Sequence, residues 1–210
     1  MSSSGSADYV ITSIEELERL YTPVNPNALM KEVAYVHEHY RKMIEAAPFV
    51  AIASAGPEGL DCTPRGDHPG FVRVVDDKTL MIPDRRGNNR IDTLRNIVRD
   101  PRVALLFLIP GVGETLRVNG RAKISVDPAL LESFAVDGKP PRSVLIVTVE
   151  SVYFQCSKAI VRSKLWDPAR QIARSALPST GTIIATLSGG KVDGAASDRE
   201  LPVRVPQQLC

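Results

Sequence analysis

The middle of the chain alternates apolar and polar positions with a period of two, the pattern of half-buried β-strands. The full set of strand-like runs is FVAIASAG (49–56), GFVRVVDD (70–77), TLMIP (79–83), RVALLFLI (102–109), TLRVNGRAKIS (115–125) and SVLIVTVESVYFQC (143–156). Two of these, RVALLFLI and the SVLIVTV part of the last run, are apolar almost throughout, which is typical of strands covered on both faces. Several antiparallel strands with few helices between them favour a closed or partly closed barrel, although a sandwich has the same periodicity.

Helical spacing marks the N-terminal part of the chain, up to about residue 47. Ser13 and Glu16 have the spacing of a capping box, in which each side chain accepts a hydrogen bond from the other residue's backbone N–H. Two further helices are expected over 28–37 and 38–47.

Two more helices are expected between the strands. One begins at about Arg90, and the other is DPALLESF (127–134), where Asp127 can cap the first turn. The chain becomes helical again after Ser157. Residues 178–210 hold several Gly, Pro and Ser with little periodicity, which predicts an extended arm.

Composition narrows the class of protein. The 210 residues are 43% hydrophobic and 24% charged with a formal net charge of +2, and the basic residues are interleaved with acidic ones, so no nucleic-acid partner is expected. The cysteines are too few and too scattered for a disulfide framework or a zinc site: Cys62, Cys156 and Cys210. No apolar stretch approaches the ~18 residues of a membrane span, and the N-terminus lacks the features of a signal peptide. We therefore expect a cytoplasmic protein with reduced thiols and no metal.

A basic, glycine-containing loop precedes the helix that begins at about Arg90. The segment RRGNNR (85–90) combines arginines with a glycine that allows close backbone approach. Directly in front of a helix N-terminus, which attracts anions, such a loop is suited to hold a phosphate. The alternative is a solvated turn in which the arginines offset Asp84 and Asp92, and the spacing alone does not separate the two.

A second unusual segment, DCTPRGDHPGFV (61–72), places charged residues around two glycines and two prolines just before a strand. On its own it is typical of a long hairpin loop with an Arg65–Asp67 pair. His68 alone carries no catalytic assignment, and no serine–histidine–acid set is visible, so nucleophilic hydrolysis is disfavoured.

The order of these segments resembles the pyridoxamine 5'-phosphate oxidase-like, FMN-binding split-barrel family. The specific part is LRNIVRDPRVALLF (94–107) followed by LRVNGRA (116–122). Three further segments resemble one subgroup of that family: DCTPRGDHPGFVRV (61–74), IPDRRGNNR (82–90) and KAIVRSKLWDP (158–168).

The resemblance implies a mainly β fold with flanking helices, a six-stranded antiparallel split β-barrel. It also implies a homodimer with two FMN sites at the dimer interface. The corresponding domains are an N-terminal helical segment (1–47), the FMN-binding barrel (48–166) and a C-terminal helix with an extended arm (167–210).

The same resemblance assigns residues to the cofactor. Asn88, Asn89 and Arg90 correspond to the segment that holds the FMN phosphate. The positions that border the flavin ring or the ribityl chain are Arg65, Gly66, Asp67, Ile82, Pro83 and Asp84. From the C-terminal side, Lys158 or Arg162 adds positive charge and Trp166 covers the cofactor. For Trp166, packing at the dimer interface is an equally good interpretation.

The chain departs from the true vitamin B6 oxidases of that family. Those enzymes carry a Tyr, Arg and Ser set after the VNG strand, whereas ALLESFAVDGKPPRSV (129–144) has Phe134 and no matching triple. The C-terminus also lacks the arginine–leucine ending of those enzymes. We therefore expect a retained flavin site with a different substrate site.

The expected function is that of an FMN-dependent oxidoreductase of unknown substrate, with hydride exchanged at flavin N5. No residue is assigned as general acid or base, although Asp67 and Cys156, and less strongly Cys62, are candidates. One alternative is a non-catalytic FMN-binding or sensor protein. Another is a split barrel that uses haem or deazaflavin F420.

Overall fold

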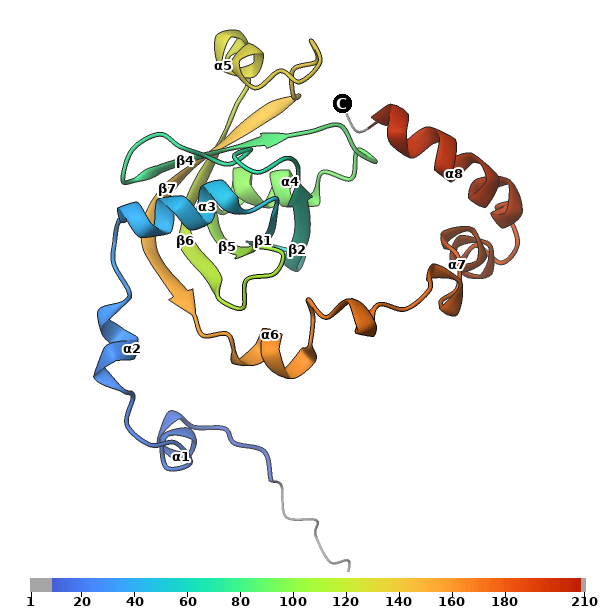
Figure 1. Ribbon diagram of the computed structural model, residues 1–210. Coiled ribbons are helices and arrows are strands. Elements are labelled where there is room, and N and C mark those ends of the chain that lie inside the picture. The colour runs from blue at the N-terminus through green and yellow to red at the C-terminus, as the bar shows by residue number, and fades with distance from the viewer. Residues whose placement is uncertain (1–8, 209–210) are drawn as a thin grey trace, which may run out of the picture. The chain divides into compact units, whose positions relative to one another are not determined.

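The computed structural model describes residues 9–208, and the chain divides between Glu32 and Val33 into two units (Figure 1). The first unit holds two short helices, α1 (Ile14–Glu18) and α2 (Pro26–Met30). Ser13 caps α1, because its hydroxyl accepts the Glu16 N–H at 3.1 Å. The Glu16 carboxylate accepts the N–H of Thr12 rather than that of Ser13, so only half of the predicted capping box forms.

The helix predicted over 28–37 is wrong beyond Met30. Asn25 caps α2 and Pro26 occupies its first turn, so the helix starts earlier than expected. Past its end, Val33 forms an isolated β-bridge with Val152, with N–H···O distances of 3.0 and 2.8 Å in the two directions. Pairing of a β-branched residue with a strand therefore ends the helical run.

The second unit is built on a seven-stranded sheet in the order β2-β1-β5-β6-β7-β4-β3, in which every pairing is antiparallel. The strands are β1 (Phe49–Gly56), β2 (Gly59–Gly66), β3 (Arg73–Val74), β4 (Thr79–Asp84), β5 (Arg102–Leu108), β6 (Thr115–Ser125) and β7 (Ser143–Gln155). The prediction of a mainly β fold with flanking helices is thus confirmed. The sheet has one strand more than the six expected, because Arg73–Val74 pairs with β4 as a separate short strand.

The predicted strands differ from the observed ones in two places. GFVRVVDD (70–77) contributes only the two residues of β3, because a turn begins at Asp76, whose carboxylate accepts the Lys78 N–H at 2.8 Å. Conversely, residues 61–66, for which the sequence pattern predicts a loop, belong to β2. β2 lies at the edge of the sheet, where Pro64 removes no hydrogen bond from a second neighbour.

The core lies on one face of β1 and β5. Val103, Leu105 and Phe107 are buried, whereas the side chain between the last two, Leu106, is 37% exposed. The expectation that β5 is covered on both faces is therefore wrong for a single chain. β7 is buried over most of its first half and pairs with both β6 and β4.

Helices flank the strands (Figure 1). They are α3 (Glu38–Ala46), α4 (Asp92–Arg99), α5 (Pro128–Ser133) and α6 (Lys158–Ser163). Asp127 caps α5 as predicted, with its carboxylate accepting the Leu130 N–H at 2.9 Å. α4 packs on β1, where Asn96 Nδ2 donates to Ser54 Oγ at 3.1 Å and both side chains are buried. This contact fixes the helix that follows the basic loop.

The chain beyond Pro178 is helical, so the prediction of an extended arm is wrong. After two 3-10 turns (Pro168–Arg170 and Arg174–Ala176) come α7 (Thr180–Leu187) and α8 (Gly194–Gln208), which pack on each other. Asp198 accepts the Gly181 N–H at 2.8 Å and also the Ser179 hydroxyl. A cap and a close backbone contact, rather than an apolar stripe, hold these helices, which explains the weak periodicity. Within residues 9–208 no helix is long and apolar enough to cross a membrane.

Candidate functional site

A pocket of about 280 Å³ lies where the ends of β2 and β4 meet the loop before α4. β2 contributes Thr63 to Gly66, β4 contributes Pro83 and Asp84, and the loop contributes residues 85–91. Apolar surface comes from Phe71 and Leu94. One further lining residue, Arg142, comes from the segment directly before β7.

Two half-buried ion pairs join the segments around the pocket. Arg65 Nη2 lies 3.2 Å from Asp84 Oδ1, which joins the end of β2 to the end of β4. Arg85 Nε lies 2.8 Å from Asp67 Oδ2, and Arg85 Nη1 donates to the Phe134 carbonyl at 2.6 Å. The two contacts of Arg85 connect the loop after β2 to the segment after α5. The Arg65–Asp67 pair expected from the sequence is replaced by these two pairs.

Burial raises the pKa of the Asp84 carboxyl, and the neighbouring Arg65 guanidinium offsets only part of that shift. The surroundings of Asp84 therefore favour the neutral form of its carboxyl more than water does.

The loop before α4 has a defined backbone. The Asn88 side-chain oxygen accepts the Arg90 N–H at 2.9 Å, and Asn89 has a left-handed conformation with φ of 60°. α4 begins at Asp92, and its N-cap residue Ile91 makes no side-chain capping hydrogen bond. The first-turn N–H groups of α4 consequently lie next to the pocket without a side-chain cap.

The lining is strongly basic. It holds one carboxylate, Asp84, and five guanidinium groups: Arg65, Arg85, Arg86, Arg90 and Arg142. Arg65, Arg85 and Arg90 each pair with an aspartate. Arg86 and Arg142 have no ion-pair partner within the described part of the chain. The residues present thus suit a ligand that carries a phosphate dianion.

A buried hydroxyl lies at the same end of the sheet. Ser143 Oγ has no hydrogen-bond partner among the described residues, although its residue is only 5% exposed. Ser143 pairs with Asp84 across the β4–β7 ladder, and directly paired residues project from the same face. A polar atom left unpartnered beside a lining residue also fits a ligand that bears hydrogen-bonding groups.

The structure brings together most of the residues predicted for a cofactor. The pocket is lined by Arg65, Gly66, Pro83, Asp84, Asn88, Asn89 and Arg90. Asp67 is joined to the lining through Arg85, whereas Ile82 is fully buried in the core.

The three predicted residues from the C-terminal side do not line this pocket of the single chain. Lys158 and Arg162 are exposed on α6, and Trp166 Nε1 donates to the Val112 carbonyl at 2.7 Å.

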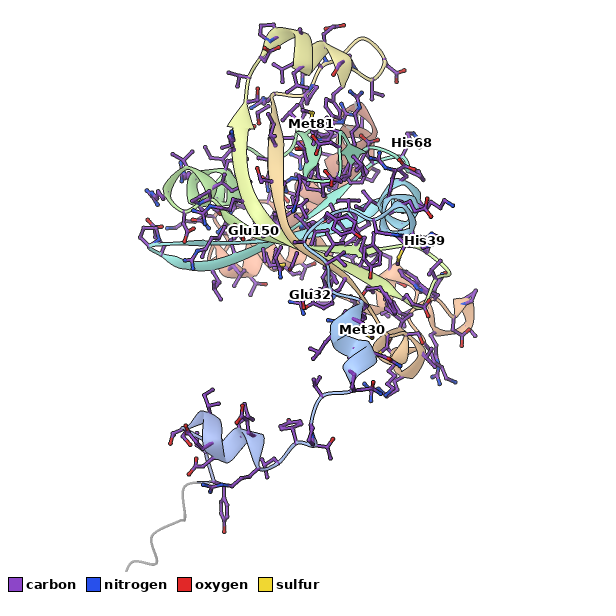
Figure 2. All side chains as sticks on the ribbon, turned by 90° about the vertical axis from the view of Figure 1, so that its left-hand side faces the viewer. Met30, Glu32, His39, His68, Met81 and Glu150 are labelled. Carbon is purple, nitrogen blue, oxygen red and sulfur yellow. The ribbon has the colours of Figure 1, made fainter. Side chains whose placement is uncertain are left out.

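The candidates for acid–base chemistry from the sequence are mostly placed elsewhere. Cys156 and Cys62 are exposed and do not line the pocket, and Asp67 is held by Arg85. His68 lies at the outer edge of the view in Figure 2, well apart from Glu150 on β7. Among the described residues no group of three or more His, Cys, Asp or Glu could hold a metal ion.

Sequence reasoning missed Arg142 and Ser143. Both are far in the chain from the lining residues of β2, β4 and the loop, and the PPRS segment that contains them has no phosphate-binding pattern. Only the register of β4 against β7 places Arg142 at the pocket and Ser143 beside the lining residue Asp84.

A family model described as pyridoxamine 5'-phosphate oxidase matches residues 36–156, more than half of the chain. No curated protein matches the chain.

Several solved structures are similar. HupZ of Group A Streptococcus is 21% identical, covering 58% of this chain and 94% of its own, with a TM-score of 0.46. A protein of Lactobacillus delbrueckii described as a putative pyridoxamine 5'-phosphate oxidase is 20% identical, covering 59% and 99%, with a TM-score of 0.46. An FMN-binding protein of Syntrophomonas wolfei is 11% identical, covering 67% and 95%, with a TM-score of 0.42.

Proposed function

The chain belongs to the pyridoxamine 5'-phosphate oxidase-like family, and on this premise we propose that it is an FMN-dependent oxidoreductase. The observation that carries the proposal is the basic pocket in front of α4. It combines an uncapped helix N-terminus with arginines that outnumber the carboxylates of the lining. Those are the features that bind a phosphate monoester.

Each part of the pocket has a role in this proposal. Asn88, Asn89 and Arg90 hold the FMN phosphate beside the first turn of α4. Arg65 and Asp84, with the backbone around Pro83, border the ribityl chain and the ring. Bound FMN supplies hydride exchange at N5, and the protein supplies orientation and charge. The substrate differs from that of the vitamin B6 oxidases, because Phe134 stands in the segment where their substrate-phosphate residues lie.

We further propose that the long strands close into a split barrel and that two chains form a homodimer with FMN at the interface. Leu106 and Phe49 leave an apolar sheet face partly exposed in a single chain, which supports a partner there. Lys158, Arg162 and Trp166 lie outside this chain's pocket, and we assign them to the flavin of the partner subunit.

Arg90→Ala tests the phosphate assignment. The purified protein is expected to be yellow and to bind FMN more tightly than riboflavin, which lacks the phosphate. A charge-assisted contact of roughly 1.5–3 kcal/mol corresponds to a loss of about 10- to 150-fold in FMN affinity, with riboflavin affinity unchanged. Arg121→Ala, at an exposed arginine outside the pocket, is the matched control.

Two results would count against the phosphate assignment. One is wild-type FMN affinity in Arg90→Ala, and the other is an equal loss of FMN and riboflavin binding. Turnover of NADH or NADPH with an electron acceptor then separates an enzyme from a protein that binds FMN without catalysis. If the purified protein has the absorbance spectrum of haem or of a deazaflavin, that group and not FMN is the cofactor.

A further inference from the structure

Arg142 reaches the pocket from a distant part of the chain. It follows Pro140 and buried Pro141 and stands directly before β7. Its backbone N–H donates to the Asp84 carbonyl at 3.2 Å, at the end of the β4–β7 ladder. Two prolines and this hydrogen bond restrict the backbone from which the side chain projects.

The side chain of Arg142 contacts the loop before α4. Arg142 Nη1 donates to Asn89 Oδ1 at 2.7 Å, across 53 positions of sequence. Asn89 is the residue of that loop with a left-handed backbone, at φ of 60°. Asparagine adopts this conformation more readily than most residues. The hydrogen bond from Arg142 restricts its side chain and so favours one conformation of the loop.

Arg142 makes no ion pair in the described part of the chain, although its charge offsets part of the rise that burial causes in the pKa of Asp84. Its contact with Asn89 engages one of five guanidinium N–H groups with a neutral oxygen, and no described carboxylate lies within ion-pair distance. Arg65 and Arg85, in contrast, are each paired with an aspartate. Arg142 therefore keeps donors available to an anion that lies against Asn89.

We propose that Arg142 both positions the phosphate loop and binds the phosphate directly. It holds Asn89 in its left-handed conformation through Nη1, and it presents its remaining N–H groups to a phosphate monoester beside the first turn of α4. The proposal rests on the proposed function in that this phosphate is the one of FMN. It adds the segment directly before β7 to a site otherwise built from β2, β4 and the loop before α4.

The test is the ratio of FMN to riboflavin affinity, measured by flavin fluorescence for a set of variants. Arg142→Met keeps the length of the side chain and removes the charge. It is expected to reduce FMN affinity about 10- to 100-fold and to leave riboflavin affinity within about twofold. Arg142→Lys keeps the charge without the planar fork and is expected to lie between Met and wild type.

A double-mutant cycle separates the two roles. Asn89→Gly permits the left-handed backbone but removes the side-chain oxygen, so it isolates the positioning contact. If Arg142 also binds the phosphate directly, Arg142→Met must still reduce FMN affinity in the Asn89→Gly background, by less than in wild type. Because Arg142 is exposed, the unfolding temperature of each variant without flavin is expected to stay within about 2 °C of wild type.

The outcomes distinguish this inference from the proposed function. If wild type prefers FMN to riboflavin and both Arg142→Met and Arg142→Lys keep that preference, the role of Arg142 is refuted and the FMN site stands. If Arg142→Met has no effect once Asn89 is glycine, the direct phosphate contact is refuted. If wild type shows no preference for FMN, the phosphate assignment itself fails, and this inference fails with it.

Discussion

Gly56, the last residue of β1, lies against α4, the helix that follows the basic loop 85–91. A Cβ added at this position would lie 2.1 Å from Asn96 Oδ1 and 2.8 Å from Asn96 Cγ. Asn96 is 8% exposed and donates to Ser54 Oγ, so its side chain has little room to move. Gly56→Ala must therefore displace Asn96 and, with it, α4.

The loss of stability expected for Gly56→Ala has two parts. Overpacking of a buried site costs about 1–3 kcal/mol, and leaving the buried amide and hydroxyl without each other adds about 1–3 kcal/mol. The loss of chain entropy in the unfolded state returns less than about 1 kcal/mol. We expect a decrease of about 2–5 kcal/mol in the free energy of unfolding. For a chain of this size that corresponds to a fall of roughly 4–20 °C in the unfolding temperature.

Far-ultraviolet circular dichroism during heating and denaturant titration measures this loss. Gly66→Ala, in the paired strand β2, is the matched control, because its nearest contact would be the Pro48 carbonyl at 3.4 Å. That variant is expected to change stability by less than about 1 kcal/mol. Adding Asn96→Ala removes the atoms that clash, so Gly56→Ala should cost far less in that background. Equal stability of Gly56→Ala and wild type, or an equal cost with and without Asn96, would refute the argument.

Two further predictions concern charge and assembly. Because burial raises the pKa of Asp84, the folded state binds the proton of this carboxyl more tightly than the unfolded state does. The resulting contribution to the free energy of unfolding is present below about pH 4 and is lost as the pH rises through the folded-state pKa. Asp84→Asn should therefore gain stability relative to wild type as the pH rises toward neutrality, measured by denaturant titration at several pH values; a growing deficit instead would contradict the sign. Sedimentation equilibrium at micromolar concentration should give about twice the chain mass of 22.9 kDa, and Leu106→Arg should lower it; a wild-type species of 22.9 kDa would contradict the dimer.

Local signals in the sequence were sufficient for much of the fold. Apolar strand-like runs predicted β1 and β7 closely, period-two alternation predicted β6, and short-range capping patterns predicted the starts of α1 and α5. Such signals fail where tertiary contacts decide. Pro64 made β2 look like a loop in the sequence, but the edge position of β2 tolerates a proline. Val33 lies in a predicted helix but pairs with Val152 in the structure.

The same distinction applies to the pocket. Asn88, Asn89 and Arg90 are contiguous and precede a helix, so the sequence contained that half of the site. Arg85 and Arg65 were visible as charged loop residues, but their partners were not, because the pairs Arg85–Asp67 and Arg65–Asp84 join separate strands. Arg142 could not be predicted at all, since its place depends on the register between β4 and β7.

β5 is predicted to be buried on both faces, but its outer face, with Leu106, is partly exposed in the single chain. An apolar run predicts the environment that a strand has in its final assembly, whereas the burial observed here is that of one chain. On the outward face, Ala51 of β1 pairs with Leu106 of β5, and Ala53 pairs with Ala104. Small side chains around one exposed leucine form a flat apolar surface that another sheet can approach closely. Coverage by a second copy would give β5 the two buried faces that its sequence predicts.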